Sequence, residues 1–409
     1  MRSTRIRTTG TALLVGGALL LATACSSAGS GGGGEKKADA GSTSAAASAA
    51  PSAAAPAAPK ASAAVLTVQP QDGAQNVAPS GALKVSVSNG KLTQVTVAGP
   101  DGKAVDGAVA ADGSWVPSGG LTVGKQYRVS ARAVDADGVA TSTSTSFSTL
   151  TPAHTAHVVD NLGDKQTYGV GMIISVEFTQ PVSNKKAVEQ AIAVQASDDT
   201  QVKGHWFGDK RLDLRPENYW KPGTTVTVHR RTTGVELSPG VYGDSDLDES
   251  FTVGRSKIST ADAATHRMTV VKDGAAPQVI AITAGDNLNP SWNGTMVVFE
   301  RKRMEHMDST TTDIKGAGYT ADEPHALKIT TTGSYVHGNP KAVTFAGHEN
   351  ISHGCIGLPD TPEGDDSSVA GKFYADSMIG DVVIVKNSVG EKVHPDNGLS
   401  GWSLPWSAW

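Results

Sequence analysis

The stretch "QYRVSARAVDADGVATSTSTSFSTL", residues 126–150, alternates apolar and polar side chains on both sides of an Asp-Gly pair. An alternation with a period of two is the pattern of a β-strand that buries one face. Asp-Gly between two such runs favours a tight hairpin turn, because glycine tolerates the positive φ angle that the turn requires. The stretch therefore predicts two antiparallel strands within a β-rich fold.

The same pattern extends towards both ends of the chain. "LKVSVSNGKLTQVTVAGPDGKAVDG" (83–107) alternates around Asn-Gly and Asp-Gly pairs, which we expect to form hairpins. Further short strands are expected in "GMIISVEFTQPV" (171–182), "LDLRPENYWKPGTTVTVHR" (212–230) and "ESFTVG" (249–254). Because short strands at regular spacing favour a sandwich, we predict two tandem immunoglobulin-like β-sandwich modules, over residues 64–150 and 151–254.

A third, mostly β domain is predicted over residues 255–388. Its expected strands lie in "HRMTVVKDGAAPQVIAITAG" (266–285), "NGTMVVFERKRMEHMDS" (293–309), "HALKITTTGSYVHG" (325–338) and "DVVIVKNS" (381–388). One short helix is expected in "DDSSVAGKFYADSMIG" (365–380), with a polar cap in its first three residues and with Val369, Phe373 and Met378 on one face.

Residues 389–409 are expected to form a C-terminal extension that contains Trp402, Trp406 and Trp409. Tryptophan side chains stack on sugars in some proteins and pack into cores in others. The residue types by themselves leave both roles open.

Residues 1–25 predict an export signal. Three arginines in the first seven residues precede the apolar run 11–24, which is shorter than the ~18–20 residues needed to span a bilayer. The run ends in Ala-Thr-Ala before Cys25, which fits either ordinary signal cleavage or a lipobox with an acylated cysteine. We expect acylation of Cys25, which would hold the exported protein on the outer face of the cytoplasmic membrane, within the cell wall.

Residues 26–63 contain mainly Ala, Ser, Gly and Pro. Such a segment buries too little apolar surface to offset the entropy of ordering, so we predict a disordered tether.

The charge balance excludes one class of partner. Lys and Arg number 35, Asp and Glu number 40, and the net charge is −5 without a long basic block, so we expect no nucleic-acid binding. "DSDLDES" (244–250) lacks the glycine and glutamate of a calcium loop, and we interpret it as a solvated loop. We expect no metal and no cofactor.

The chain has two cysteines, Cys25 and Cys355. If Cys25 is acylated, Cys355 has no disulfide partner in the chain, which indicates intermolecular pairing or a reactive group. Three histidines, His337, His348 and His353, lie close to Cys355 in sequence. An imidazole that takes the proton of a thiol creates a thiolate, so the pattern indicates a Cys/His acyl-transfer site.

Two other interpretations of Cys355 remain open at the level of residue types. Free cysteine often packs as a small buried apolar residue. Histidine and cysteine are also the residue types that bind zinc, although the spacing of these four matches no familiar zinc pattern. Gly354, directly before the thiol, favours the catalytic interpretation, because it permits a tight backbone whose N–H groups can point at an oxyanion.

The strongest signal is a resemblance to a known family. "VHG" (336–338), followed after a short gap by "SHGC" (352–355), resembles the signature of the L,D-transpeptidase catalytic domain. "MDSTTTDIKGAGYT" (307–320) is similar to the active-site lid of that family, with Tyr319 at its aromatic position. The paired modules and the Trp-rich extension resemble the lipid-anchored actinobacterial branch, which implies that the three tryptophans pack against the neighbouring module.

The resemblance implies a cysteine acyltransferase that acts on peptidoglycan stem peptides. Cys355 would attack the carbonyl of the third residue of a tetrapeptide stem, form a thioester and release D-Ala. The side-chain amine of a second stem would resolve the thioester and leave a 3→3 cross-link. His337 would act as the base, oriented by the backbone carbonyl of Gly338.

The resemblance also implies the groups that surround the substrate and the inhibitors of the enzyme. The residues that would form the pocket, the oxyanion hole and the lid are Met307, Tyr319, Ser352, His353 and Gly354. Carbapenems would inactivate the enzyme through Cys355.

One position departs from the family pattern. The Asn that usually lies two residues after the cysteine is Gly357 here, so a side-chain amide is missing. Two alternative functions follow: an L,D-carboxypeptidase, whose acceptor is water, and a non-catalytic cell-wall-binding lipoprotein.

Overall fold

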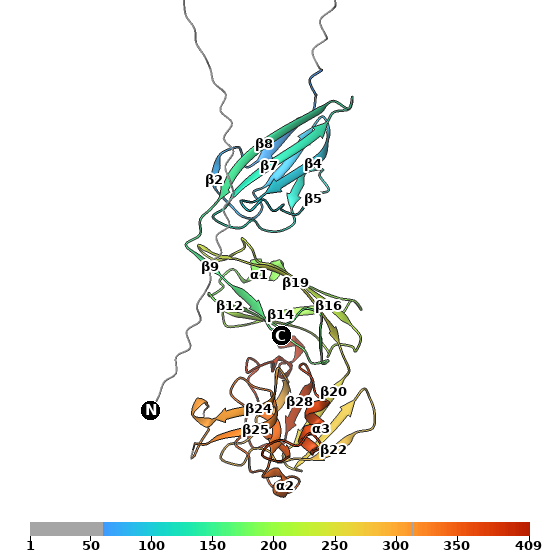
Figure 1. Ribbon diagram of the computed structural model, residues 1–409, viewed down its shortest axis with the longest axis vertical. Coiled ribbons are helices and arrows are strands. Elements are labelled where there is room, and N and C mark those ends of the chain that lie inside the picture. The colour runs from blue at the N-terminus through green and yellow to red at the C-terminus, as the bar shows by residue number, and fades with distance from the viewer. Residues whose placement is uncertain (1–59, 313, 317) are drawn as a thin grey trace, which may run out of the picture. The chain divides into compact units, whose positions relative to one another are not determined.

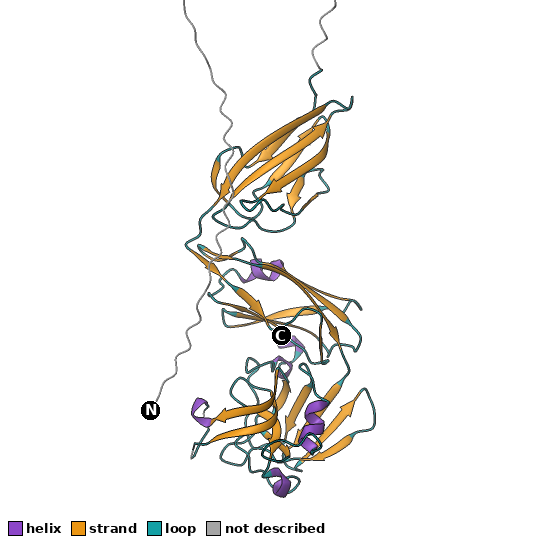
Figure 2. Ribbon diagram, in the orientation of Figure 1, coloured by secondary structure: helices purple, strands orange, loops and turns teal. Residues whose placement is uncertain are grey.

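The protein is described by a computed structural model that covers residues 60–312, 314–316 and 318–409. The predicted export signal, Cys25 and most of the predicted tether lie outside the described residues. The fold is mainly β, as predicted, with few and short helices (Figure 1 and Figure 2). Within the described ranges, the helices are too short or too polar to cross a bilayer.

The first module contains two four-stranded sheets, with the orders β1-β3-β6-β5 and β2-β8-β7-β4. Its strands are β1 (Val65–Gln69), β2 (Ala74–Val77), β3 (Lys84–Ser88), β4 (Lys91–Ala98), β5 (Gly107–Val109), β6 (Trp115–Pro117), β7 (Gln126–Val134) and β8 (Ala140–Thr149). Alternate side chains of β7 are buried, and Trp115 and Phe147 fill the core between the sheets.

Of the three hairpins predicted in this module, two are confirmed and one is wrong. At Asp101-Gly102 the chain reverses, and Ala98 and Ala104 form an antiparallel bridge. β7 and β8 pair antiparallel around Asp137-Gly138, from Gln126↔Ser148 to Val134↔Ala140. At Asn89-Gly90, however, β3 pairs with β1 and β6, whereas β4 pairs with β7. The chain passes from one sheet to the other at this turn. The dipeptide therefore predicted the turn correctly, but it did not predict which strands pair.

The predicted tether ends earlier than residue 63. The backbone N–H of Ala63 donates to the Asp135 carboxylate at 2.9 Å, and the Ser62 hydroxyl donates to the carbonyl of Val139 at 2.8 Å. These bonds attach Ser62 and Ala63 to the β7–β8 turn, so both residues belong to the first module.

The second module has two four-stranded sheets, β10-β12-β15-β14 and β11-β19-β16-β13, and a three-stranded sheet, β17-β18-β9. Its strands are β9 (His154–Ala156), β10 (Val158–Asp160), β11 (Gln166–Tyr168), β12 (Ile174–Phe178), β13 (Ile192–Ala196), β14 (Val202–Phe207), β15 (Arg211–Pro216), β16 (Thr225–Arg231), β17 (Glu236–Ser238), β18 (Val241–Gly243) and β19 (Asp246–Val253). Its helix α1 (Lys185–Ala191) was not predicted. The prediction of a solvated loop over 244–250 is wrong from Asp246 onwards, because β19 begins there.

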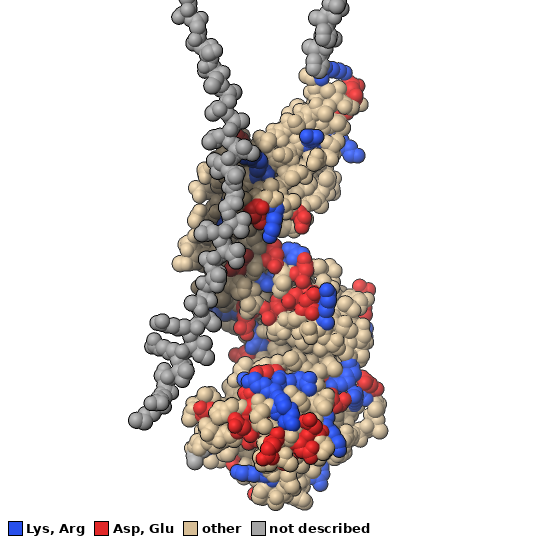
Figure 3. Space-filling model, in the orientation of Figure 1, with Lys and Arg blue, Asp and Glu red and all other residues tan. Residues whose placement is uncertain are grey.

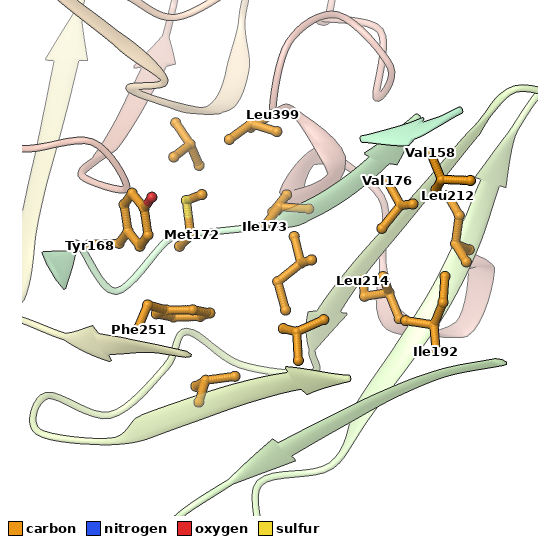
Figure 4. Close-up of a cluster of buried hydrophobic side chains, with 14 of the residues drawn as sticks. Val158, Tyr168, Met172, Ile173, Val176, Ile192, Leu212, Leu214, Phe251 and Leu399 are labelled. Atoms are coloured by element: carbon orange, nitrogen blue, oxygen red, sulfur yellow. The ribbon is translucent and has the colours of Figure 1, made fainter. Parts of the chain in front are cut away.

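The core of the second module continues into residues near the C-terminus. Figure 4 shows Tyr168, Met172, Ile173 and Phe251 of this module, with Leu399 beside them. Val297 and Val382 of the third domain belong to the same buried cluster and, like Ile173, are inaccessible to solvent. Burial of apolar surface, worth about 25 cal/mol per Å², therefore contributes to the association of these two parts.

The third domain has a five-stranded sheet, β22-β21-β20-β28-β23, and a four-stranded sheet, β24-β25-β26-β27. Its strands are β20 (Lys257–Asp262), β21 (Arg267–Lys272), β22 (Gln278–Ala281), β23 (Gly294–Val297), β24 (Glu300–Asp308), β25 (Thr320–Lys328), β26 (Tyr335–Asn339), β27 (Ile356–Pro359) and β28 (Val382–Lys386). Apolar side chains from both sheets share one core, which includes Met268, Leu327 and Phe373.

The third domain has two α-helices, where one was predicted. The expected helix is α3 (Val369–Ala375), but Ser368 caps it, accepting a hydrogen bond from the N–H of Gly371 at 2.8 Å. Phe373 is buried as predicted, whereas Val369 is 41% exposed and Met378 lies beyond the end of the helix, so the predicted apolar face is wrong at these two positions. The unpredicted helix, α2 (Ala342–Phe345), is a single turn, too short to produce a helical period in the sequence.

The C-terminal extension packs against the second module, as predicted. Its two 3₁₀ turns are η2 (Gly401–Ser403) and η3 (Trp406–Ala408). The indole N–H of Trp402 donates to the carbonyl of Gly171 at 2.8 Å, and that of Trp409 donates to the carbonyl of Lys203 at 2.8 Å. The guanidinium of Arg215 lies over both rings, at 4.5 and 4.3 Å from their centroids.

Acidic and basic side chains are interspersed over the third domain on the face seen in Figure 3. This mixed surface agrees with the small net charge of the chain.

Candidate active site

The thiol and one imidazole lie on adjacent strands of the four-stranded sheet. β26 and β27 pair in parallel, with His337 opposite Gly357, so His337 lies diagonally across from Cys355, the residue that precedes β27. Residues two apart along a strand point to the same face. The register therefore places the side chains of His337 and Cys355 on one face.

Cys355 is largely buried, with 6% of its surface exposed. It contacts Met307, Ala326 and Tyr335, and Tyr319 packs against the same cluster. The burial alone agrees with the structural interpretation of this cysteine, and the thiol donates a long hydrogen bond of 3.8 Å to the carbonyl of Gly333. The thiol also lies close enough to the His337 imidazole to raise the pKa of that ring, which favours the catalytic interpretation.

Of the three histidines near Cys355 in sequence, only His337 lies buried beside the thiol. His337 is 4% exposed, whereas His348 and His353 are exposed. Its Nδ1 lies 2.7 Å from the carbonyl oxygen of Gly338, which accepts the Nδ1 proton and leaves Nε2 for the thiol. This is the tautomer that a base acting on Cys355 requires.

The environment of His337 favours the imidazolium. Burial acts against the charged form, but hydrogen bonding to Cys355 and to Glu323, together with their negative charges, outweighs it and raises the pKa of His337 to about 10. A protonated imidazole beside a thiol is the kind of electropositive neighbour that makes a cysteine reactive.

Gly338 is required because Asp360 occupies the space that a side chain would fill, and not because the backbone has a positive φ angle. β26 runs from Tyr335 to Asn339, so Gly338 lies within the strand. A Cβ at Gly338 would lie 2.1 Å from Oδ2 of Asp360, which no packing tolerates. Asp360 in turn is bound by His325, whose Nδ1 lies 2.6 Å from the same oxygen.

The residues before the thiol form a tight loop. The hydroxyl of Ser352 donates to the carbonyl of Cys355 at 2.6 Å and accepts from the N–H of Gly354 at 3.2 Å. Gly354 has a φ of 116°, a conformation that a side chain would strain. The N–H of Gly354 is therefore used inside the loop.

Tyr319 and Met307, both predicted to lie around the substrate, border the thiol. The backbone of Tyr319 exchanges hydrogen bonds with Ser309, which follows β24 and begins the 3₁₀ turn η1 (Ser309–Thr311). The Tyr319 ring lies 4.8 Å from the ring of His353. Burial and the nearby charges of Cys355 and Glu323 raise the pKa of Tyr319 to about 12, so its hydroxyl remains protonated. Asp313 and Ala317 of the predicted lid lie outside the described residues.

The space of the missing Asn side chain is already occupied. A Cβ at Gly357 would lie 2.8 Å from Cγ2 of Thr283 and 3.1 Å from Cβ of Asn339. Asn339 lies two residues after His337 on β26, and its Oδ1 accepts the N–H of Lys341 at 2.9 Å. The sequence shows that Gly357 departs from the family pattern, but not that Thr283 and Asn339 fill the space beside it.

Three residues near the site were not predicted: Glu323, Asp360 and His325. None belongs to a motif: Glu323 and His325 lie on β25, and Asp360 directly follows β27. In the ranges that the structure describes, no group of three His, Cys, Asp or Glu side chains has a geometry suited to a metal ion.

Comparisons with known proteins place these features in context. The sequence profile of the L,D-transpeptidase catalytic domain matches residues 256–385, and that of a bacterial Ig domain matches residues 74–236. L,D-transpeptidase 2 of Mycobacterium tuberculosis is 32% identical over 348 residues, which cover 84% of this chain and 83% of the relative. L,D-transpeptidase 5 of the same organism is 29% identical and covers 84% and 76%. The solved structure of LD transpeptidase LdtMt1 in complex with imipenem is 27% identical, covers 56% of this chain and 97% of that chain, and has a TM-score of 0.47.

Proposed function

Because this chain belongs to the L,D-transpeptidase family, we propose that it forms 3→3 cross-links between peptidoglycan stem peptides through a thioester on Cys355. The observation that carries the proposal is the geometry of one catalytic unit. The carbonyl of Gly338 holds Nδ1 of His337 at 2.7 Å, and the other side of the ring serves the buried thiol of Cys355.

The first half-reaction is acyl transfer to sulfur. The thiolate of Cys355 attacks the carbonyl carbon of the third residue in a tetrapeptide stem, and the negative charge moves to the carbonyl oxygen. When this intermediate collapses, the bond to the terminal D-Ala breaks and the imidazolium of His337 gives its proton to the leaving amine. The products are a thioester and free D-Ala.

The second half-reaction uses an amine as the acceptor. Neutral His337 takes a proton from the side-chain amine of a diamino acid on a second stem, and this amine attacks the thioester carbonyl. The C–S bond breaks, the 3→3 amide forms, and the thiolate–imidazolium pair is restored.

We assign the stabilisation of the oxyanion to the backbone at Cys355. The Gly354 N–H is occupied by Ser352, so the N–H of Cys355 itself is the donor we assign to this role. The φ of 116° at Gly354 sets the direction of that N–H.

Incubation of the full chain with tetrapeptide stems, followed by mass spectrometry, tests the proposal. We expect dimers that lack one D-Ala, and none with the Cys355→Ala variant, which should remain folded. Formation of tripeptides without dimers would replace the proposal by a carboxypeptidase, and the absence of both products would replace it by a non-catalytic wall-binding protein.

A carbapenem provides a second, independent readout. We expect one covalent adduct per chain, located on Cys355 by peptide mapping and lost in Cys355→Ala. An unmodified wild-type chain would contradict the assignment of the nucleophile.

We further propose that the protein is exported and held on the outer face of the cytoplasmic membrane by acylation of Cys25. The support is the sequence of residues 1–25 alone. Mass analysis of the N-terminal peptide of the mature protein should find a diacylated Cys25, and Cys25→Ser should release the protein from the membrane fraction. An unmodified N-terminal peptide would contradict the anchor.

A further inference from the structure

A carboxylate that no motif announces lies beside the catalytic histidine. Oε2 of Glu323 is 3.4 Å from Nδ1 of His337, the nitrogen that also faces the carbonyl of Gly338. Glu323 reaches this position from β25, and its side chain is 17% exposed.

Oε2 of Glu323 has no other polar partner. It is buried and accepts no well-formed hydrogen bond from the described residues. His337 is also its only ion-pair partner among the residues that the structure describes. A buried carboxylate without a donor is costly unless an opposite charge compensates for it, so its presence favours a protonated His337.

The other charged groups around the site are already compensated. Glu305 lies directly opposite Glu323 in the β24–β25 ladder, but Lys302 pairs with it at 2.6 Å and the Tyr335 hydroxyl donates to it at 3.0 Å. The remaining titratable neighbours are the thiol of Cys355 and the hydroxyl of Tyr319. Glu323 is therefore the carboxylate whose charge acts on His337.

We propose that Glu323 is a positioning residue of the catalytic unit, which holds Nδ1 of His337 towards the Gly338 carbonyl and stabilises the imidazolium that protonates the departing D-Ala amine. This proposal rests on the proposed function for the identity of the leaving group. The proposed effect of Glu323 on the protonation of His337 does not depend on the substrate, because the carboxylate faces a ring nitrogen of His337.

The chain contains a matched control on the same strand. Asp322 is adjacent to Glu323 on β25 and also faces a histidine, since its Oδ1 lies 2.7 Å from Nδ1 of His306. Both side chains of that pair are 67% exposed. Asp322→Asn therefore removes a carboxylate from a histidine without changing the catalytic unit.

The test is a titration of His337 by NMR in the full chain labelled at histidine, with His337→Gln used to assign its signal. In Glu323→Gln, which keeps the shape of the side chain, we expect the midpoint for loss of the imidazolium proton to fall by about one pH unit or more. The alkaline limb of the kcat/KM profile should move in the same direction. Asp322→Asn should leave both unchanged, and Glu323→Asp should give an intermediate midpoint.

An unchanged His337 titration in a folded Glu323→Gln protein would overturn the proposal, as would an equal shift in Asp322→Asn. If Glu323→Gln failed to fold, a Glu323→Asp midpoint equal to that of the wild type would overturn it as well. Because the titration needs no substrate, a wild-type chain without transpeptidase activity would refute the proposed function and leave this test intact.

Discussion

Two buried histidines of the same sheet, His325 on β25 and His337 on β26, each meet a carboxylate, but they have different surroundings. Both ring nitrogens of His325 are occupied, Nδ1 by Asp360 at 2.6 Å and Nε2 by Asp366 at 3.0 Å. His337 uses Nδ1 for Gly338 and keeps the other nitrogen for a thiol. The two histidines are alike in burial and in having a nearby carboxylate. They differ in the second ring nitrogen, which is occupied by a carboxylate in His325 and is left for the thiol in His337, the proposed base.

The largest expected effect is on catalysis. Replacing His337 by Gln removes the group that exchanges protons with the thiol and the leaving amine, so kcat/KM should fall by about 10²–10⁴-fold. The measurement is cross-link formation at fixed stem concentration, with circular dichroism to verify folding. His348→Gln, at an exposed position just after α2, should retain wild-type activity. Equal losses in the two variants would contradict the assignment of the base.

The structural histidine should instead matter for stability. His325→Leu leaves the buried Oδ2 of Asp360 without its donor, and the unfolding free energy should fall by about 3 kcal/mol. Urea denaturation measures the change. The exposed pair of His306 with Asp322 is the control, because His306→Leu should have no measurable effect. A stable His325→Leu protein would remove the contrast between the two histidines.

A smaller effect is expected for a substitution at Gly338, which follows His337 on β26. Gly338→Ala places a methyl group 2.1 Å from Oδ2 of Asp360, so the strand or the carboxylate must shift at a cost of about 1–3 kcal/mol. Activity should fall with stability, because the Gly338 carbonyl orients His337. Gly119→Ala, whose Cβ would meet no atom closer than 3.6 Å, is the control for glycine replacement in thermal denaturation. Wild-type stability of Gly338→Ala would show that the backbone adapts.

The last expected effect is the pH dependence of stability. The folded state raises the pKa of His337 to about 10, whereas an unfolded histidine titrates near 6.5. The stability that this proton contributes is therefore complete below about pH 6.5 and is lost as the pH rises towards 10. Between these values the unfolding free energy of the wild type should fall more steeply than that of His337→Gln. Parallel curves for the two proteins would show that His337 is not protonated in the folded state.

Sequence patterns predicted the β class, the paired modules, the catalytic family and the residues Cys355 and His337. Each of these depends on local information: an alternation of period two, a turn dipeptide or a short motif at a fixed spacing. The same local signals failed at Asn89-Gly90, where the turn is present but the strands belong to different sheets. They also failed at α2, a single turn that leaves no period.

Only the tertiary structure explains why residue 338 is glycine, and only it shows that Glu323 lies beside His337. These facts join β25, β26 and the end of β27, which are brought together by the register of a sheet and by the packing of its core. A sequence records which side chains are available. Distances between strands arise only when burial and backbone pairing select one register, and the chemistry of this site depends on those distances.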